Sequence, residues 1–330
     1  MTSLIESVTS SFGPDIVKSL GSVLGTDASA ITKALGAASP LLLSGMTKMA
    51  SNPTGAESLL KLLPQDSGFL GNLASAVGNV FGGTQGGAAA LLPALFGQGT
   101  SAIAGTLSRA LGFNVAPLIN LLAPAMLGAV AKLVKERNLD AAGLGATLKE
   151  EADAFRNAPE HRETATLVHD ALASGEVAQT LIGRFGDDWA AAVSGPAAAL
   201  AAVATADLSG PMGSIAEARA ANDALEKAAR HAAPGSLLAT AFGAGLTTDM
   251  LTDVRRIAPT KDGLIEQIRK AAAAVATHAP DEVQAYRDTL QAVAQASAEA
   301  TKDGGFLGIG GKLVSKDEQA ALDAIRSALG

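Results

Sequence analysis

From Ser67 to Ser108 the chain carries no Asp, Glu, Lys or Arg, and a second uncharged span runs from Ala110 to Ala131. Uncharged segments of this length either fill the interior of a folded protein or enter a membrane, because both places exclude charge. Asn79 and Pro93 interrupt the first span and Asn120 the second, and each would leave polar groups unpaired in hydrocarbon. We therefore expect helices buried in protein, and a peripheral contact with a membrane surface stays open as an alternative.

Small side chains must fill this interior. Aromatic residues make up 3% of the chain, whereas 36 of its 330 residues are Gly, so Ala, Leu and Val supply most of the packing. No run of β-branched residues alternates with polar ones, as a half-buried strand would require. The sequence predicts an all-α fold, and at about 100–200 residues per domain its length predicts two helical domains.

Charge divides the chain in two. Residues 1–140 carry 8 Lys and Arg against 7 Asp and Glu, and residues 141–330 carry 17 against 25, for a net charge of −7. We place a Gly- and Ala-rich helical domain at residues 1–150, a helical connector at 151–191 and an acidic helical domain at 192–330. Because phosphates are neutralised by clustered Lys and Arg, which the chain lacks, we expect no nucleic-acid partner.

A weak internal repeat marks the first domain. Ser39-Pro-Leu-Leu42 is similar to Ala123-Pro-Ala-Met126, and each copy is followed by a polar turn and a second helix. Thr54 and Glu57 have the spacing of a capping box, which predicts the start of one second helix, and Asp140 predicts the start of the other. A helix pair of this kind cannot bury its apolar face alone, so we expect the two copies to pack against each other.

Apolar residues of the acidic domain recur every three or four positions, which indicates helices with one buried face. The stripes are Ile265, Ile268, Ala272 and Val275; Val283, Tyr286, Leu290 and Val293; and Leu322, Ile325 and Leu329. Ser214 with Glu217, and Ser315 with Glu318, have capping-box spacing and predict two further helix starts.

From about Gly21 to Glu151 the chain resembles the YidB-like family of bacterial proteins, whose role is obscure. The motifs that carry this resemblance are Leu20-Gly-Ser-Val-Leu-Gly25, Asn52-Pro-Thr-Gly-Ala-Glu57, Leu95-Phe-Gly97 and Leu122-Ala-Pro124. The resemblance implies a compact helical domain and almost nothing about activity.

From about Ala192 to its end the chain resembles the TerB-like helical domains associated with tellurite resistance and stress. The likeness rests on Ala206-Asp207 with Ser214-Ile-Ala-Glu217, and on Lys302-Asp-Gly-Gly-Phe-Leu-Gly308 with Val314-Ser-Lys-Asp-Glu318. Some members are thought to bind a divalent metal through such acidic turns. The metal ligands that the resemblance implies are Asp207, Glu217, Asp303 and Glu318. Helix capping is the alternative role of the two glutamates.

No motif predicts catalysis. The chain has no Cys, and its four histidines lack the spacing of metal ligands or of a catalytic triad. The stretch Gly304–Lys312 departs from a phosphate-binding loop, since Phe306 stands at the first glycine position and Leu313 at the Ser or Thr position. We expect no enzyme, no catalytic residue and no cofactor, with a divalent metal ion as the alternative.

The first residues lack the basic start and unbroken apolar stretch of a secretory signal, which predicts a cytoplasmic protein. The favoured hypothesis is a non-enzymatic scaffold that self-associates or binds a protein partner through its first domain. A metal-responsive stress module and a peripheral membrane protein are the alternatives. The sequence identifies no small-molecule substrate.

Overall fold

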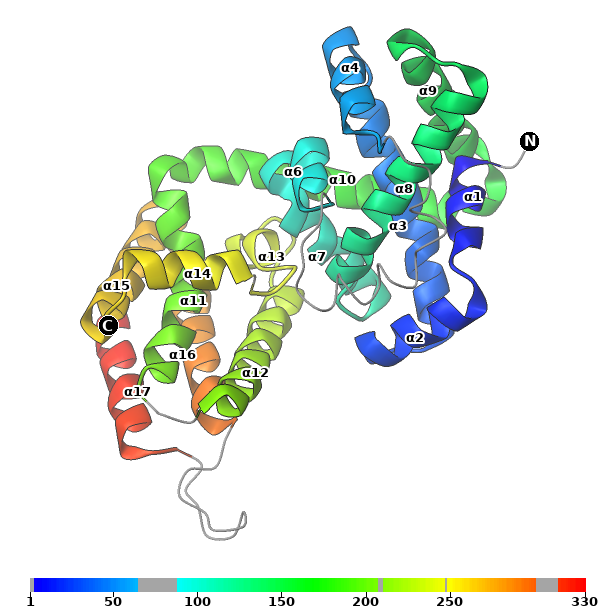
Figure 1. Ribbon diagram of the computed structural model, residues 1–330. Coiled ribbons are helices and arrows are strands. Elements are labelled where there is room, and N and C mark those ends of the chain that lie inside the picture. The colour runs from blue at the N-terminus through cyan, green and yellow to red at the C-terminus, as the bar shows by residue number, and fades with distance from the viewer. Residues whose placement is uncertain (1–2, 65–87, 207–209, 247, 301–313) are drawn as a thin grey trace. The chain divides into compact units, whose positions relative to one another are not determined.

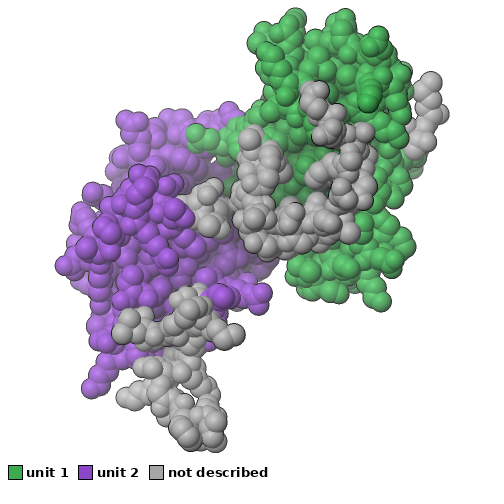
Figure 2. All heavy atoms as spheres, viewed as in Figure 1, with its two compact units in different colours: residues 1–177 green, residues 178–330 purple. Residues whose placement is uncertain are grey.

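The computed structural model describes residues 3–64, 88–206, 210–246, 248–300 and 314–330. Within these ranges every regular element is a helix and none is a strand, which confirms the predicted all-α fold. The chain divides into two compact units, residues 1–177 and 178–330 (Figure 2). The boundary between the units falls inside a helix of the stretch that the sequence marks as a helical connector.

Unit 1 begins with helices of increasing length and ends within the long helix α10 (Figure 1). Its elements are α1 (Leu4–Ser11), α2 (Pro14–Leu24), α3 (Ala28–Met49), α4 (Pro53–Leu62), α6 (Ala88–Phe96), the 3₁₀ turn η2 (Gly97–Gly99), α7 (Thr100–Leu111), α8 (Ala116–Arg137), α9 (Ala141–Asn157), the 3₁₀ turn η3 (Pro159–His161) and α10 (Arg162–Phe185).

Two helical hairpins form the centre of unit 1. Helix α3 packs against α8, and the shorter helices that follow them, α4 and α9, pack against each other. Leu41 and Leu42 in α3 and Leu121 and Leu122 in α8 are inaccessible to solvent. The two copies of the internal repeat therefore bury their apolar faces together, as the sequence predicts.

The two second helices begin with the same kind of cap. The Asn52 side chain accepts a hydrogen bond from the Gly55 N–H at 2.8 Å, and the Asp140 side chain accepts one from the Gly143 N–H at 2.7 Å. The start predicted at Asp140 is confirmed. The start predicted from Thr54 is wrong: α4 begins at Pro53, because proline is favoured in the first helical position and asparagine before it.

One helix among the described residues, α8, is long and apolar enough to cross a membrane. Within its most apolar window, 61% of the residues are buried inside the structure. The buried helix of a protein core meets the same criteria of length and composition, and α8 occupies that position in unit 1.

Glycines permit close approaches between segments of unit 1. A Cβ atom added to Gly99 would lie 2.7 Å from the carbonyl oxygen of Gly175 in α10. A Cβ atom added to Gly145 in α9 would lie 2.8 Å from the carbonyl oxygen of Ala50. Because real Cβ atoms cannot come so close to backbone oxygens, these positions require glycine, as expected for small-residue packing.

Unit 2 begins with the last part of α10. Its further elements are the 3₁₀ turn η4 (Gly186–Asp188), α11 (Trp189–Ala204), α12 (Gly210–His231), α13 (Leu237–Ala241), α14 (Thr248–Ile257), α15 (Lys261–His278), the 3₁₀ turn η5 (Pro280–Glu282), α16 (Val283–Glu299) and α17 (Lys316–Leu329).

Helix α11 is the centre of unit 2. It packs against α12, α14, α15, α16 and α17, and its residues from Ala197 to Val203 are all buried. The stripes of α15, α16 and α17 are buried as predicted, apart from the half-buried Val283 at the start of α16. An Ala-rich central helix lets five neighbours approach closely, because small side chains keep the helix thin.

Candidate functional site

Of the four residues assigned to a metal, the structure describes two. Glu217 lies in α12 and Glu318 in α17, whereas Asp207 and Asp303 lie outside the described residues, as does the stretch 304–312. Among the residues that are described, no three His, Asp or Glu side chains gather closely enough to hold a metal ion. The four-residue ligand set therefore stays a prediction.

Glu318 caps the start of α17. Its carboxylate accepts a hydrogen bond from the Ser315 N–H at 2.7 Å, and the Ser315 hydroxyl accepts one from the Glu318 N–H at 3.1 Å. This reciprocal pair confirms the capping box and the helix start predicted at Ser315. The side chain is 1% exposed, and the N-terminal end of a helix favours its negative charge.

Glu217 lies in the interior of α12 and has no capping role. The helix start predicted at Ser214 is wrong, since α12 begins at Gly210 and Pro211 provides the fixed backbone angle that suits a first turn. The Glu217 side chain is nevertheless 1% exposed. Moving a carboxylate from water into a protein interior is costly unless it is partnered, so its burial sets Glu217 apart from the surface glutamates.

Both glutamates belong to helices that start at the same end of unit 2. A hydrogen bond joins Tyr286 near the start of α16 to Ala192 near the start of α11, so these two helices run side by side in the same direction. Their C-terminal ends lie together, and α12 and α17 begin there (Figure 1). Glu217 and Glu318 therefore both lie in helices that begin at this end of unit 2.

A third buried carboxylate belongs to a polar group that the sequence analysis missed. Glu226 in α12 accepts a hydrogen bond from the Asn222 side chain at 2.8 Å, and the Asn222 side-chain oxygen accepts the Leu246 N–H at 2.7 Å. Gly245 lies against both side chains with a left-handed backbone (φ 74°). The group anchors the loop that precedes α14, and no local pattern connects residues 24 positions apart.

His278, at the end of α15, pairs with a carboxylate of the turn before α11. Its Nε2 lies 2.8 Å from Oδ2 of Asp188. The imidazole ring lies against Phe185, with ring centres 5.0 Å apart, and the rings of Phe185 and Trp189 form a T-shaped pair with centres 5.7 Å apart. The group joins the end of α15 to the start of α11 within unit 2.

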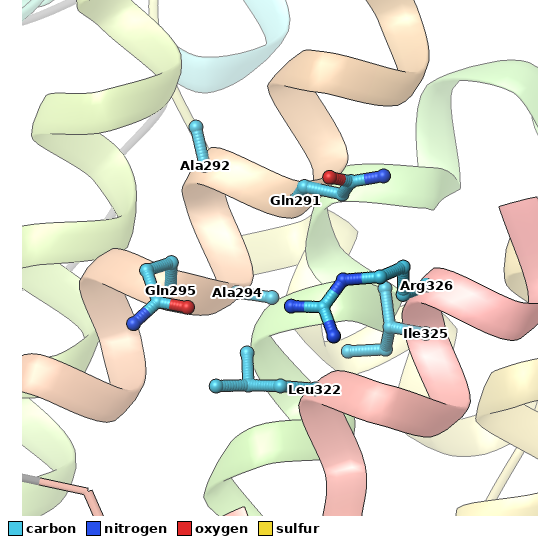
Figure 3. Close-up of a pocket in the computed structure, with 7 residues that line it drawn as sticks. All are labelled: Gln291, Ala292, Ala294, Gln295, Leu322, Ile325 and Arg326. Carbon is cyan, nitrogen blue, oxygen red and sulfur yellow. The ribbon is translucent and has the colours of Figure 1, made fainter. Parts of the chain in front are cut away.

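A groove opens on unit 2 between α16 and α17 (Figure 3). Its volume is about 220 Å³. The buried side chains of Ala294, Leu322 and Ile325 form its floor, and Gln291, Gln295 and Arg326 stand around it. Figure 3 shows the guanidinium of Arg326 extending from α17 over the floor towards α16.

Unit 1 carries a surface without charge. No charged residue occurs between Ala88 and Ser108, and Pro93, Ala94 and Gln98 are exposed there. These three exposed side chains therefore offer a partner no charge. We call these exposed residues, which belong to α6 and to the turn η2 before α7, the uncharged α6–α7 surface. The earlier part of the uncharged sequence, residues 67–87, lies outside the described residues.

Comparison with known proteins supports the first of the two family resemblances. Residues 6–133 match the family described as bacterial protein of unknown function (DUF937), which is the YidB-like family. The matched residues run from α1 into α8 and include both helices of the first hairpin. The chain matches no curated protein and no solved structure.

Proposed function

We propose that this protein is a non-enzymatic scaffold that binds another protein chain through unit 1, with a second copy of itself as the first partner to test. The observation that carries the proposal is the uncharged α6–α7 surface, where Pro93, Ala94 and Gln98 face solvent. The central parts of protein interfaces are depleted of charged residues, because each buried charge would lose its hydration.

Two further features support this function. Residues 1–140, which contain the uncharged α6–α7 surface, are almost neutral, so this part of the chain adds little electrostatic repulsion when two copies meet. Pro93 and Ala94 have short side chains, so a partner helix could approach the backbone of α6 closely. Within unit 1 itself, Gly99 and Gly175 already permit an approach of this kind.

The test is the mass of the protein in solution. Light scattering over a concentration series should show a mass above that of one chain, and Ala94→Glu with Gln98→Glu should shift the protein towards the monomer. Thr54→Glu with Lys61→Gln makes the same change of two charge units at exposed positions of α4 and should leave the mass unchanged. A strict monomer at every concentration, or equal effects of the two changes, would reject self-association.

Liposome flotation separates this proposal from a peripheral membrane role. An uncharged surface that binds protein should leave the chain at the bottom of the gradient with neutral and with anionic vesicles. Flotation that the Ala94→Glu and Gln98→Glu changes abolish would instead assign the surface to a lipid interface, and would overturn the scaffold proposal.

A second candidate function is a metal-responsive stress module, as the resemblance of residues 192–330 to TerB-like domains implies. The observation that favours it is the burial of Glu217 and Glu318 in helices that start at one end of unit 2. Carboxylate oxygens are the ligands that a hard divalent cation prefers.

Thermal unfolding with calcium, magnesium or zinc tests this second function. An ion that binds the folded state should raise the midpoint, by an amount equivalent to about 2.7 kcal/mol at a concentration 100 times the Kd. Glu217→Gln should remove the rise, whereas Glu226→Gln, which changes another buried carboxylate of α12, should preserve it. No shift with any of the three ions would exclude the module.

A further inference from the structure

We propose that the groove between α16 and α17 binds a small aliphatic carboxylate, with its hydrocarbon on the apolar floor and its head group on Arg326. This site lies in unit 2 and is independent of the scaffold and metal functions. The chemistry of the groove, its charge and its length support this assignment.

The floor of the groove suits a hydrocarbon chain. Ala294, Leu322 and Ile325 are buried and present methyl and methylene groups where α16 and α17 meet. At roughly 30 Å³ per water molecule, a volume of about 220 Å³ corresponds to about seven waters. A chain of around six carbons would displace most of that water and cover the apolar floor, which favours binding.

Arg326 provides the positive charge above this floor. One of its amino groups donates to Asp323 at 2.8 Å, and both side chains are 59% exposed. An exposed pair of this kind is weak, and a guanidinium has five N–H donors in a planar fork. The remaining donors can hold a ligand carboxylate, which arginine binds with charge-assisted hydrogen bonds. The carboxamides of Gln291 and Gln295 complete the polar rim.

The length of the groove argues for a small molecule over a partner helix. Its lining extends from Gln291 to Gln295 on one helix and from Leu322 to Arg326 on the other. Four residue steps correspond to about 6 Å of helix. A docked helix uses anchor residues over two turns or more, about 11 Å, so it would extend well beyond the groove.

Titration of the full chain with hexanoate tests the site. Calorimetry should show saturable binding at one site, and methyl NMR signals of Leu322 and Ile325 should shift with the same affinity. Hexylammonium has the same chain length and the opposite charge, and should bind at least tenfold more weakly. Ala292→Phe fills the exposed rim of the groove and should abolish hexanoate binding.

Arg326→Gln should weaken hexanoate binding about tenfold, as expected for the loss of a charge-assisted hydrogen bond. Arg269→Gln is the matched control, because Arg269 is 53% exposed and pairs with Glu266 three positions away on α15, outside the groove. Hexanoate binding that is absent, that is unchanged by Ala292→Phe, or that falls equally in both arginine variants would overturn the proposal. Equal binding of hexylammonium would do so as well.

Discussion

The hydroxyl of Tyr286 donates a hydrogen bond to the carbonyl oxygen of Ala192. In a regular helix this oxygen would accept the N–H of residue 196, but residue 196 is proline and has no N–H. Tyr286 is fully buried, so its hydroxyl and the Ala192 carbonyl satisfy each other away from water. The Tyr286 side chain of α16 thereby replaces the backbone hydrogen bond that Pro196 removes from α11, the central helix of unit 2.

Tyr286→Phe should reduce the free energy of unfolding by about 1–3 kcal/mol, because it keeps the ring and leaves a buried carbonyl unpaired. Chemical denaturation measures the loss. Pro196→Ala supplies the missing N–H, so Tyr286→Phe should cost clearly less in that background. The same cost in both backgrounds would show that the hydroxyl does not act through the Ala192 carbonyl.

Gly195→Ala should also destabilise unit 2, by about 1–3 kcal/mol, because the added methyl overfills a packed site. A Cβ atom at this position would lie 2.0 Å from the Tyr286 hydroxyl oxygen. Removal of that oxygen in Tyr286→Phe should lower the cost of Gly195→Ala, which denaturation of the double variant measures. Gly183→Ala in α10 is the control, since a Cβ there meets nothing within 4 Å. That change should be neutral or stabilising.

Alkaline pH should unfold the protein partly through Tyr286. Burial raises the pKa of its hydroxyl above the usual value of about 10. Above pH 10 the unfolded chain releases a proton that the folded chain keeps. The free energy of unfolding therefore falls as pH rises, by up to about 1.4 kcal/mol per pH unit from this group.

Tyr286 is the one tyrosine of the chain, so tyrosinate absorbance reports on it alone. We expect the absorbance to rise together with the loss of helical circular dichroism, and Tyr286→Phe to unfold with a shallower dependence on pH. Tyrosinate that forms near pH 10 in a fully helical protein would contradict this prediction.

Glu282 holds the start of α13. Its carboxylate accepts the Leu237 N–H at 2.7 Å. Burial raises the pKa of this carboxyl, and the hydrogen bond from Leu237 and the charge of Arg184 partly oppose the rise. As pH increases from about 4.3, the unfolded chain loses this proton before the folded chain does. The contribution of Glu282 to the free energy of unfolding therefore declines between that pH and its folded pKa.

Glu282→Gln removes the titration and keeps an oxygen that can accept the Leu237 N–H. It should flatten the pH dependence of stability above pH 4 and leave stability near neutral pH similar or higher. Glu282→Ala also removes the acceptor and should cost about 0.5–1.5 kcal/mol at neutral pH. Denaturation curves over a pH series distinguish the two variants. Equal losses of unfolding free energy in Glu282→Gln and Glu282→Ala would mean that the hydrogen bond from Leu237 does not stabilise the fold.

Patterns that depend on neighbours in sequence predicted much of this fold. The stripes containing Ile268, Leu290 and Ile325 are buried because a helix brings every third or fourth residue to one face. The caps at Asp140 and Ser315 involve residues three positions apart. Both partners of each cap therefore fall within one short sequence pattern. The capping role predicted for Glu318 is confirmed, and its role as a metal ligand stays a prediction.

Features that depend on distant residues were not predictable in this way. His278 meets Asp188 across 90 positions, and nothing in the sequence near either residue indicates the pair. The burial of Glu217 follows from the packing of α12, which its own sequence pattern does not reveal. The groove lined by Arg326 likewise exists only once α16 and α17 are side by side.

The start of α4 shows how two local signals can compete. Asn52 caps the helix through the Gly55 N–H, and a Cβ atom on Gly55 would lie 1.9 Å from the carbonyl oxygen of Met49. Gly55→Ala should therefore displace the cap and cost about 1–3 kcal/mol of unfolding free energy. Gly143 has the same position after Asp140 in α9. The atom nearest to a Cβ added there would be Oδ1 of the Asp140 side chain, at 3.2 Å.

Gly143→Ala should consequently be much milder, because the neighbour is a side-chain atom that can move and alanine favours a helix by about 1 kcal/mol over glycine. Denaturation of both variants compares the two copies of the repeat directly. A loss for Gly143→Ala as large as that for Gly55→Ala would show that the cap, and not the approach of the Met49 carbonyl, sets the need for glycine after each turn.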